Sequence, residues 1–183
     1  MREELSDNFV KLRRHRVEED APLLYEAVRE SIPEISRWLP WCHPGYSIEE
    51  SREWLAARPA AWDAGTDYAF VIEDAQTGEF LGGGGLSQLK MAVKFANLGY
   101  WVRTSRAGRG IATAATLLMA RFGFEDVGLE RIQIVAAKGN LASQRVAEKA
   151  GALREGVLRK SLLVGGQLHD SVLFSLIRED LNL

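Results

Sequence analysis

Hydrophobic and polar positions alternate along the chain in a pattern that predicts strands interleaved with helices. Residues 8–16 alternate apolar and basic side chains, which is typical of an edge strand or a half-buried strand. Residues 18–31 have an acidic first turn and helical spacing, so they predict a helix. A second helix is expected over residues 47–65, with Ser47 as its cap. Between the two, residues 32–47 carry three prolines and two tryptophans and predict a loop or a short helix.

The rest of the chain continues the alternation and predicts one α/β unit. The elements expected there are a strand hairpin at 67–74 and 80–89 around a turn at 75–79, a strand at 95–103, a helix at 110–126, a strand at 131–137, a capped helix at 140–151, and two strands at 154–164 and 169–177 around a turn at 165–167. No internal repeat or linker interrupts the pattern. We therefore expect a single domain over residues 1–183, with mostly antiparallel strands and interposed helices.

Composition places the chain among ordinary globular proteins. Of its 183 residues, 46% are hydrophobic and 26% are charged, and no apolar run approaches the roughly 20 residues of a membrane helix. The initial segment MREELSDNF is charged and lacks the apolar core of a secretory signal, so we expect a cytoplasmic protein with no membrane partner. The single cysteine, Cys42, cannot form an internal disulfide, and His15, His43 and His169 lack metal-ligand spacing, so we expect no metal.

Charge is divided unevenly along the chain. Residues 1–79 contain 9 Lys or Arg and 17 Asp or Glu, a balance of −8, whereas residues 80–183 contain 14 and 8, a balance of +6, which together give the net charge of −2. A basic half can hold a polyanionic ligand, and an acidic half can attract a cationic one. The plain alternative is that both are solvated surfaces of one domain. Because the whole chain is slightly acidic, nucleic-acid binding is disfavoured.

The segment RAGRGIATAA, residues 106–115, combines bare backbone, positive charge and the start of a helix. Gly108 and Gly110 let main-chain N–H groups approach a ligand, and the helix that begins near Gly110 adds unsatisfied donors and the positive end of its dipole. Arg106 and Arg109 flank these donors, and guanidinium groups favour phosphate oxygens. The segment therefore predicts a phosphate cradle, although spacing alone equally allows a glycine turn before a surface helix.

Two common phosphate loops do not match this segment. A Walker loop ends in Gly-Lys-Ser/Thr, which is absent, and a dinucleotide loop needs a glycine where Thr113 stands and an acidic residue where the next strand ends in Lys138. A run of four glycines, residues 82–85, lies within an expected strand rather than before a helix. That position favours a flexible or bulged strand over a surface that lets a substrate approach.

The strand, loop, helix and strand of residues 99–137, followed by NLASQRVAEKAGA, resemble the cofactor-binding half of the GCN5-related N-acetyltransferases (GNAT), which bind acetyl-coenzyme A. Their loop pattern, Gln/Arg-x-x-Gly-x-Gly/Ala, falls on residues 107–112, with a departure at Ala107, where the family prefers Gln or Arg. Since this loop binds pyrophosphate largely through its backbone, we expect a weakened but intact site. The resemblance implies a mostly antiparallel mixed sheet of six to seven strands, with helices on both faces and a splay between the two central strands.

A second motif refines the resemblance. Many family members carry Asn-x-x-Ala-x-x-Leu-Tyr-x-x-x-Gly, whose tyrosine is the general acid for the departing thiolate. The corresponding residues here are Asn140, Ser143, Val146, Ala147 and Gly151, so the tyrosine is absent and a serine follows the asparagine. This resembles the RimJ/RimL ribosomal-protein N-terminal acetyltransferases and implies Ser143 as the catalytic acid. From the sequence alone, a first-turn serine making local hydrogen bonds is the alternative.

The resemblance also implies which residues contact acetyl-coenzyme A. The backbone of residues 100–103 would pair with the pantetheine arm, and the N–H group of Trp101 or Val102 would polarise the thioester carbonyl. The cofactor-binding residues we expect are Trp101, Val102, Arg103, Arg106, Ala107, Gly108, Arg109, Gly110, Ile111, Ala112, Thr113, Asn140 and Ser143.

The expected acceptor is a primary amine. An α-amine, with a pKa of about 7.7–8.0, is about a tenth neutral at pH 7, whereas neutralising a lysine costs roughly 3 kcal/mol more. The strand at 95–103 contains no acidic residue to act as a base, which favours the α-amine of a protein or peptide. The alternatives are a small amine, such as a polyamine, an amino acid or an aminoglycoside, and a non-catalytic acyl-coenzyme A-binding protein. The resemblance also allows a homodimer.

Candidate groups for the acceptor side come from the first half of the chain and one late strand. Trp38 and Trp41 suit one wall of an amine or peptide cleft, although core packing is the more common fate of tryptophan. Glu34, Asp170, His43 and water-linked backbone carbonyls are candidates for removing the amine proton. A plain surface position is the alternative for each of these side chains.

Overall fold

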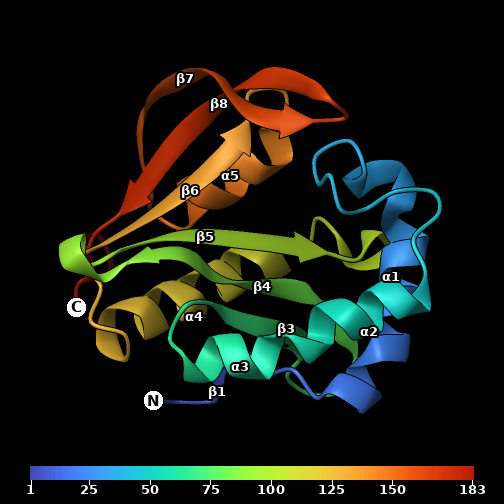
Figure 1. Cartoon of the computed structure of the whole chain (residues 1–183). Coiled ribbons are helices and arrows are strands. Elements are labelled where there is room, and N and C mark those ends of the chain that lie inside the picture. The colour runs from blue at the N-terminus through green and yellow to red at the C-terminus, as the bar shows by residue number, and fades with distance from the viewer.

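A computed structural model describes residues 1–183 as strands and helices in alternating order (Figure 1). The strands are β1 (Glu4–Ser6), β2 (Val10–Arg14), β3 (Tyr68–Asp74), β4 (Phe80–Lys90), β5 (Phe95–Val102), β6 (Arg131–Ala137), β7 (Leu153–Val164) and β8 (Gln167–Leu176). The helices are α1 (Val17–Ile35), α2 (Ile48–Ala56), α3 (Arg58–Asp63), α4 (Ile111–Glu125) and α5 (Leu141–Lys149). Single 3-10 turns, η1 (Met91–Val93), η2 (Thr104–Arg106) and η3 (Arg178–Leu181), complete the set.

All strands belong to one 8-stranded sheet in the order β1-β2-β3-β4-β5-β6-β8-β7. Only β5 and β6 run parallel, and they pair over just Phe95–Asn97 and Arg131–Gln133 before they diverge. The expected mostly antiparallel sheet with a central splay is therefore confirmed, and the splay lies between β5 and β6. The main-chain groups of β5 beyond Asn97 therefore have no strand partner on the β6 side.

The expected number of six to seven strands is too low by one. The additional strand, β1, spans only three residues and pairs with β2, so it is too short to appear as a periodic pattern. Because β2 lies between β1 and β3, residues 8–16 are not an edge strand. The half-buried interpretation is correct, since Val10 and Leu12 are fully buried while Lys11 is not.

Two helices depart from their expected bounds. The helix expected over residues 47–65 is divided into α2 and α3, because Pro59 starts a new first turn. Ser47 caps α2 as expected, accepting a hydrogen bond from the Glu50 N–H group at 3.2 Å. The first helix runs on through Pro33 to Ile35, where Ile32 and Ile35 pack against the smaller of two hydrophobic cores.

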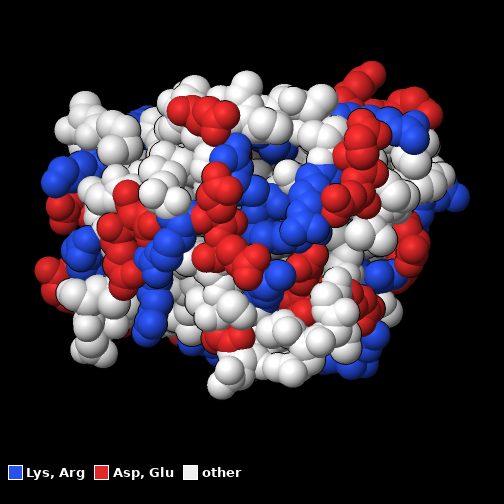
Figure 2. Space-filling view, turned by 90° about the horizontal axis from the view of Figure 1, so that it is seen from below, with Lys and Arg blue, Asp and Glu red and all other residues white.

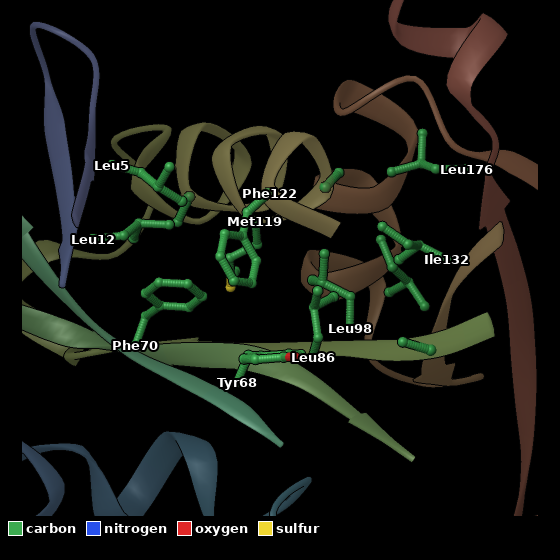
Figure 3. Packing of buried hydrophobic residues seen from close by; sticks show 14 of the residues in the cluster. Leu5, Leu12, Tyr68, Phe70, Leu86, Leu98, Met119, Phe122, Ile132 and Leu176 are labelled. Carbon is green, nitrogen blue, oxygen red and sulfur yellow. The ribbon is translucent and has the colours of Figure 1, made fainter. Parts of the chain in front are cut away.

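Helices cover both faces of the sheet, as expected, and each face has its own hydrophobic core. Helix α4 packs Met119 and Phe122 against Phe70, Leu86 and Leu98 in the larger core (Figure 3). Helices α1 and α2 cover the opposite face of the sheet through the smaller core, which includes Leu24, Val28, Leu55 and Val71. Each face of the sheet thus packs against its own helix layer. Strand β5 contributes to both cores, through Leu98 on one face and Trp101 on the other.

The outer surface carries charge of both signs. In Figure 2, Lys and Arg side chains are intermixed with Asp and Glu side chains over the face seen from below. None of the helices is long and apolar enough to cross a membrane.

Candidate active site

A cavity of about 750 Å³ lies on the α1/α2 face of the sheet and reaches β5. Its floor includes Gly83, Gly85 and Gly99 of β4 and β5, where the absence of side chains leaves room above the sheet. Its aromatic walls come from the segment between α1 and α2, from α2 and from β5, and they are formed by Trp41, Tyr46, Trp54 and Trp101. The cavity is therefore shaped by small residues below and large rings around it.

The glycine run 82–85 is a regular part of β4 rather than a flexible segment. All four glycines pair with β3 and β5 in register, and the bulge in this hairpin lies just before them, at Leu81. A Cβ atom on Gly82 would lie 2.2 Å from the Trp101 carbonyl oxygen, and one on Gly85 would lie 2.5 Å from that of Tyr68. Close approach of the backbones thus requires glycine here, and it also clears the cavity floor.

The loop before α4 presents a set of unpaired main-chain donors. Gly108 and Gly110 have φ values of +76° and +88°, a conformation that favours glycine. The first helical hydrogen bond is that of Ala114 N–H to the Gly110 carbonyl, at 3.0 Å, and no N–H group from Gly108 to Thr113 donates a hydrogen bond within the protein. A Cβ atom on Gly108 would meet nothing within 4 Å, so the space above the loop is open. These donors and the helix dipole fit a phosphate group.

The arginines near this loop have different surroundings. Arg106 binds Glu79 through two hydrogen bonds, at 2.9 and 2.6 Å. Arg103 binds Glu30 through Nε at 3.0 Å and Glu26 at 2.9 Å, and its hydrogen bond lowers the pKa of Glu30 to about 2. Arg109, by contrast, is exposed and forms no ion pair. Of the three arginines at this loop, Arg109 is the one whose guanidinium group has no carboxylate partner.

The backbone of β5 distinguishes the two N–H groups expected to face the thioester. Arg103 N–H donates to the Leu81 carbonyl at 2.8 Å, toward β4. Because successive N–H groups of a strand point to opposite sides, the Trp101 N–H group also faces β4, and the Val102 N–H group points into the splay. Val102 is therefore the better placed of the two.

Ser143 lies in the first turn of α5, across the splay from β5. Asn140 caps this helix by accepting a hydrogen bond from the Ser143 N–H group at 3.1 Å. The Tyr100 hydroxyl contacts the Ser143 carbonyl oxygen at 3.0 Å and its Oγ at 3.1 Å. Burial raises the pKa of Tyr100 to about 12, while the hydrogen bond to Ser143 opposes the shift. The two hydroxyls thus form one hydrogen-bonded pair at the splay.

The structure separates the two tryptophans expected at the acceptor site. Trp41 lines the cavity and contacts the Trp101 ring edge-on, with ring centroids 5.8 Å apart. Trp38 instead lies over Gly139, in a second recess that it shares with Asp170. Trp41 therefore belongs to the cavity wall, and Trp38 lies outside that cavity.

The candidate bases are also in different places. His43 lines the cavity, and its Nε2 is 2.9 Å from Glu50 Oε2. That hydrogen bond and the Ser47 N–H group lower the pKa of Glu50. Glu34 accepts a hydrogen bond from the Thr104 hydroxyl at 3.1 Å and does not line the cavity. Of the side chains expected as a base, only His43 faces the cavity.

Sequence reasoning missed several residues of this site. Tyr100 stands 43 positions before Ser143, and a strand tyrosine carries no sign of a contact with a distant helix. Glu53 and Trp54 of α2 also line the cavity, together with His15 after β2 and Asp67 before β3. The acidic excess of the first half was the only signal that pointed toward them.

Comparison with known proteins shows the family of the chain. The family model described as Acetyltransferase (GNAT) domain matches residues 10–153. YdaF of Bacillus subtilis (strain 168), which is named for ribosomal N-acetyltransferase activity, is 32% identical over 163 residues, covering 88% of this chain and 87% of the relative. The chain belongs to the GNAT family of acetyltransferases, and the expected family is confirmed.

Solved structures share the fold over nearly the whole chain. Mycobacterium smegmatis RimJ in complex with CoA-disulfide superposes with a TM-score of 0.86 at 29% identity, covering 95% of this chain and 84% of that one. RimL, described as a ribosomal L7/L12 alpha-N-protein acetyltransferase in complex with coenzyme A, has a TM-score of 0.86 at 22% identity, covering 93% and 95%. The RimL likeness concerns the fold alone.

Proposed function

We propose that this acetyltransferase transfers the acetyl group of acetyl-coenzyme A to the α-amino group of a protein or peptide. The observation that carries the proposal is the cavity on the α1/α2 face, which reaches β5 and is lined by Trp41, Trp54 and the carboxylates of Glu50, Glu53 and Asp67. Aromatic faces and carboxylates suit a cationic acceptor. The names of YdaF and RimJ support a protein as that acceptor.

The splay and its loop are the proposed donor site. When bound, acetyl-coenzyme A supplies an activated acetyl thioester. The N–H groups from Gly108 to Thr113 would hold its diphosphate, and Arg109 would add an unengaged positive charge. The Val102 N–H group, which points into the splay, would donate to the thioester carbonyl and stabilise negative charge on its oxygen. Asn140 fixes the first turn of α5, and thereby the position of Ser143.

Ser143 and Tyr100 hold the proton that the departing thiolate needs. A serine hydroxyl by itself is a weak acid, whereas a buried phenol with a pKa of about 12 is a stronger one and stays protonated at neutral pH. Ser143 Oγ can present a proton to the sulfur and recover one from Tyr100 Oη, 3.1 Å away. On the acceptor side, His43, oriented by Glu50, is the group placed to take a proton from the amine.

Thiol release measured over a panel of amino-terminal peptides, polyamines and amino acids tests the proposal. We expect transfer to peptides with a free α-amine, and we expect Ser143→Ala to lower kcat by about a hundredfold. The thermal shift produced by acetyl-coenzyme A should stay the same in this variant. The matched control is Ser36→Ala at the end of α1, where the serine engages the helix through its backbone N–H group.

Each contrary result has a distinct meaning. Unchanged turnover in Ser143→Ala would remove the serine from the mechanism. Transfer to polyamines or amino acids alone would favour the small-amine alternative, which the acidic cavity lining also suits. Cofactor binding without transfer to any acceptor would leave a non-catalytic binding protein.

A further inference from the structure

The cavity extends from β5 over β4 to β3 as a channel across the sheet. Its floor is the row formed by Gly99, Gly85 and Ala69, which lie opposite one another on β5, β4 and β3 and face α1 and α2. Ser87 and Asp67 also line the cavity from the neighbouring row of the sheet. A row of small residues flanked by polar ones leaves a channel that runs perpendicular to the strands.

The channel has a length that fits several acceptor residues. Two strand spacings separate Gly99 from Ala69, roughly 10 Å, and an extended peptide advances about 3.3 Å per residue. His15, just after β2, lines the cavity beside β3. An acceptor with its amine at β5 therefore places its second to fourth residues near the far end of the channel.

Charged and aromatic groups at this far end suit a cation. Glu53 is exposed and forms no ion pair, and Trp54 is 42% exposed. Arg58 is the only Lys or Arg in the lining, and it is engaged by Asp67 at 3.5 Å and lies over the Trp54 ring at 4.7 Å. Negative charge from Glu53 is therefore left without compensation, whereas no free cation remains for an anionic ligand.

His15 shows that the protein alone does not satisfy this end of the channel. Its side chain is 2% exposed, packs edge-on against Trp54 with ring centroids 5.0 Å apart, and has no hydrogen-bond partner at either ring nitrogen. Buried polar groups normally have partners. Burial lowers the pKa of His15 to about 4, so the ring is neutral at pH 7 and does not repel a cation.

We propose that the far end of the channel, formed by His15, Glu53 and Trp54, binds a Lys or Arg side chain at the second to fourth residue of the acceptor peptide. Its positive group lies between the Glu53 carboxylate and the exposed surface of Trp54. This inference rests on the proposed function, because the α-amine at β5 fixes the origin from which the residues are counted.

Two matched peptides test the inference. Both have a free amino terminus, and they differ only in carrying Lys or its uncharged analogue norleucine at the third residue. With wild-type protein we expect the Lys peptide to have a kcat/KM about five- to tenfold higher, with the difference in KM. Glu53→Gln should abolish this preference, and about 0.5 M salt should reduce it. Glu49→Gln, an exposed carboxylate on the same helix that does not line the cavity, should retain it.

Binding of both peptides, followed by tryptophan fluorescence, separates this inference from the proposed function. Glu53-dependent binding of the Lys peptide without acetyl transfer would support the channel site and contradict the proposed reaction. Transfer with equal kcat/KM for both peptides, or a Lys preference that survives in Glu53→Gln, would overturn the channel site and leave the reaction intact. A preference for norleucine would overturn it as well.

Discussion

The contact between Tyr100 and Ser143 shows how a single residue acquires its chemistry from its surroundings. The Ser143 carbonyl can only accept a hydrogen bond, so when Tyr100 donates to it, the Ser143 hydroxyl must donate to Tyr100. When Tyr100 donates to Ser143 Oγ instead, the serine proton is free to face the splay. The pair therefore has two arrangements. In one, the Ser143 hydroxyl donates its proton to Tyr100, and in the other this proton is free to point into the splay.

Replacing Tyr100 tests whether it acts through Ser143. We expect Tyr100→Phe to lower kcat about tenfold with little change in KM for acetyl-coenzyme A, because the phenyl ring keeps its packing and loses only the hydroxyl. In a Ser143→Ala background the same change should have little further effect, since the relay is already broken. Steady-state kinetics of the two single variants and the double variant measure this coupling. Multiplicative losses in the double variant would contradict a shared proton path.

At the scale of elements, the loop between β5 and α4 depends on a firmly anchored helix behind it. Ile111, Ala115, Met119 and Phe122 bury one side of α4 in the larger core, so the start of the helix is fixed. The left-handed conformation of Gly110 then ends the loop and directs the free N–H groups toward open space. The donor site is therefore a property of a loop, a helix and a strand together.

Gly110→Ala tests the backbone conformation of this loop. A Cβ atom here would lie 4.0 Å from Phe9, an ordinary contact, so the cost comes from the φ of +88° alone. We expect a loss of about 1–2 kcal/mol in the free energy of unfolding and a smaller thermal shift with acetyl-coenzyme A.

Gly156→Ala in β7 is the matched control for this change. It adds the same methyl group where nothing lies within 4 Å and the φ is ordinary, so it should leave both quantities unchanged. If Gly110→Ala behaves like this control, the left-handed conformation is not needed for cofactor binding.

At the scale of the whole molecule, the cavity and the loop before α4 draw their unengaged charged groups from different halves of the chain. The second half supplies Arg109 and the main-chain donors of the loop, whereas the first half supplies Glu50, Glu53 and Asp67 to the cavity. Carboxylates of the first half also lie beside the loop, where Glu26 and Glu30 pair with Arg103 and Glu79 pairs with Arg106. The uneven charge of the sequence thus leaves an unengaged arginine, Arg109, at the loop and an unengaged carboxylate, Glu53, in the cavity.

The buried His15 gives the whole molecule a stability that depends on pH. Its pKa is about 4 in the folded protein against 6.5 ordinarily, so between these values the unfolded chain binds a proton that the folded chain does not. The free energy of unfolding should therefore fall as the pH is lowered through this window, with His15 accounting for about 3 kcal/mol by pH 4. Above pH 6.5 this contribution is fully present.

Urea unfolding of His15→Phe between pH 7 and pH 4 measures this contribution. Since phenylalanine takes up no proton, we expect the variant to lose less stability than the wild type over this range. His169→Gln removes an exposed histidine and should follow the wild type. Parallel losses in wild type and His15→Phe would show that other groups govern the acid response.

The sequence by itself determined the order of the elements, the glycine loop before α4, the Asn140 cap and the family, because each depends on neighbouring residues and their spacing. It did not reveal β1, which is too short for a period, or the division of the helix at Pro59. Only the tertiary structure revealed the hydrogen bond between the Tyr100 and Ser143 hydroxyls. It also placed Trp38 and Trp41 in different cavities and brought His15, Glu53 and Asp67 together along one channel. Those relations depend on strand register and sheet order, which join residues far apart in the chain and leave no local pattern.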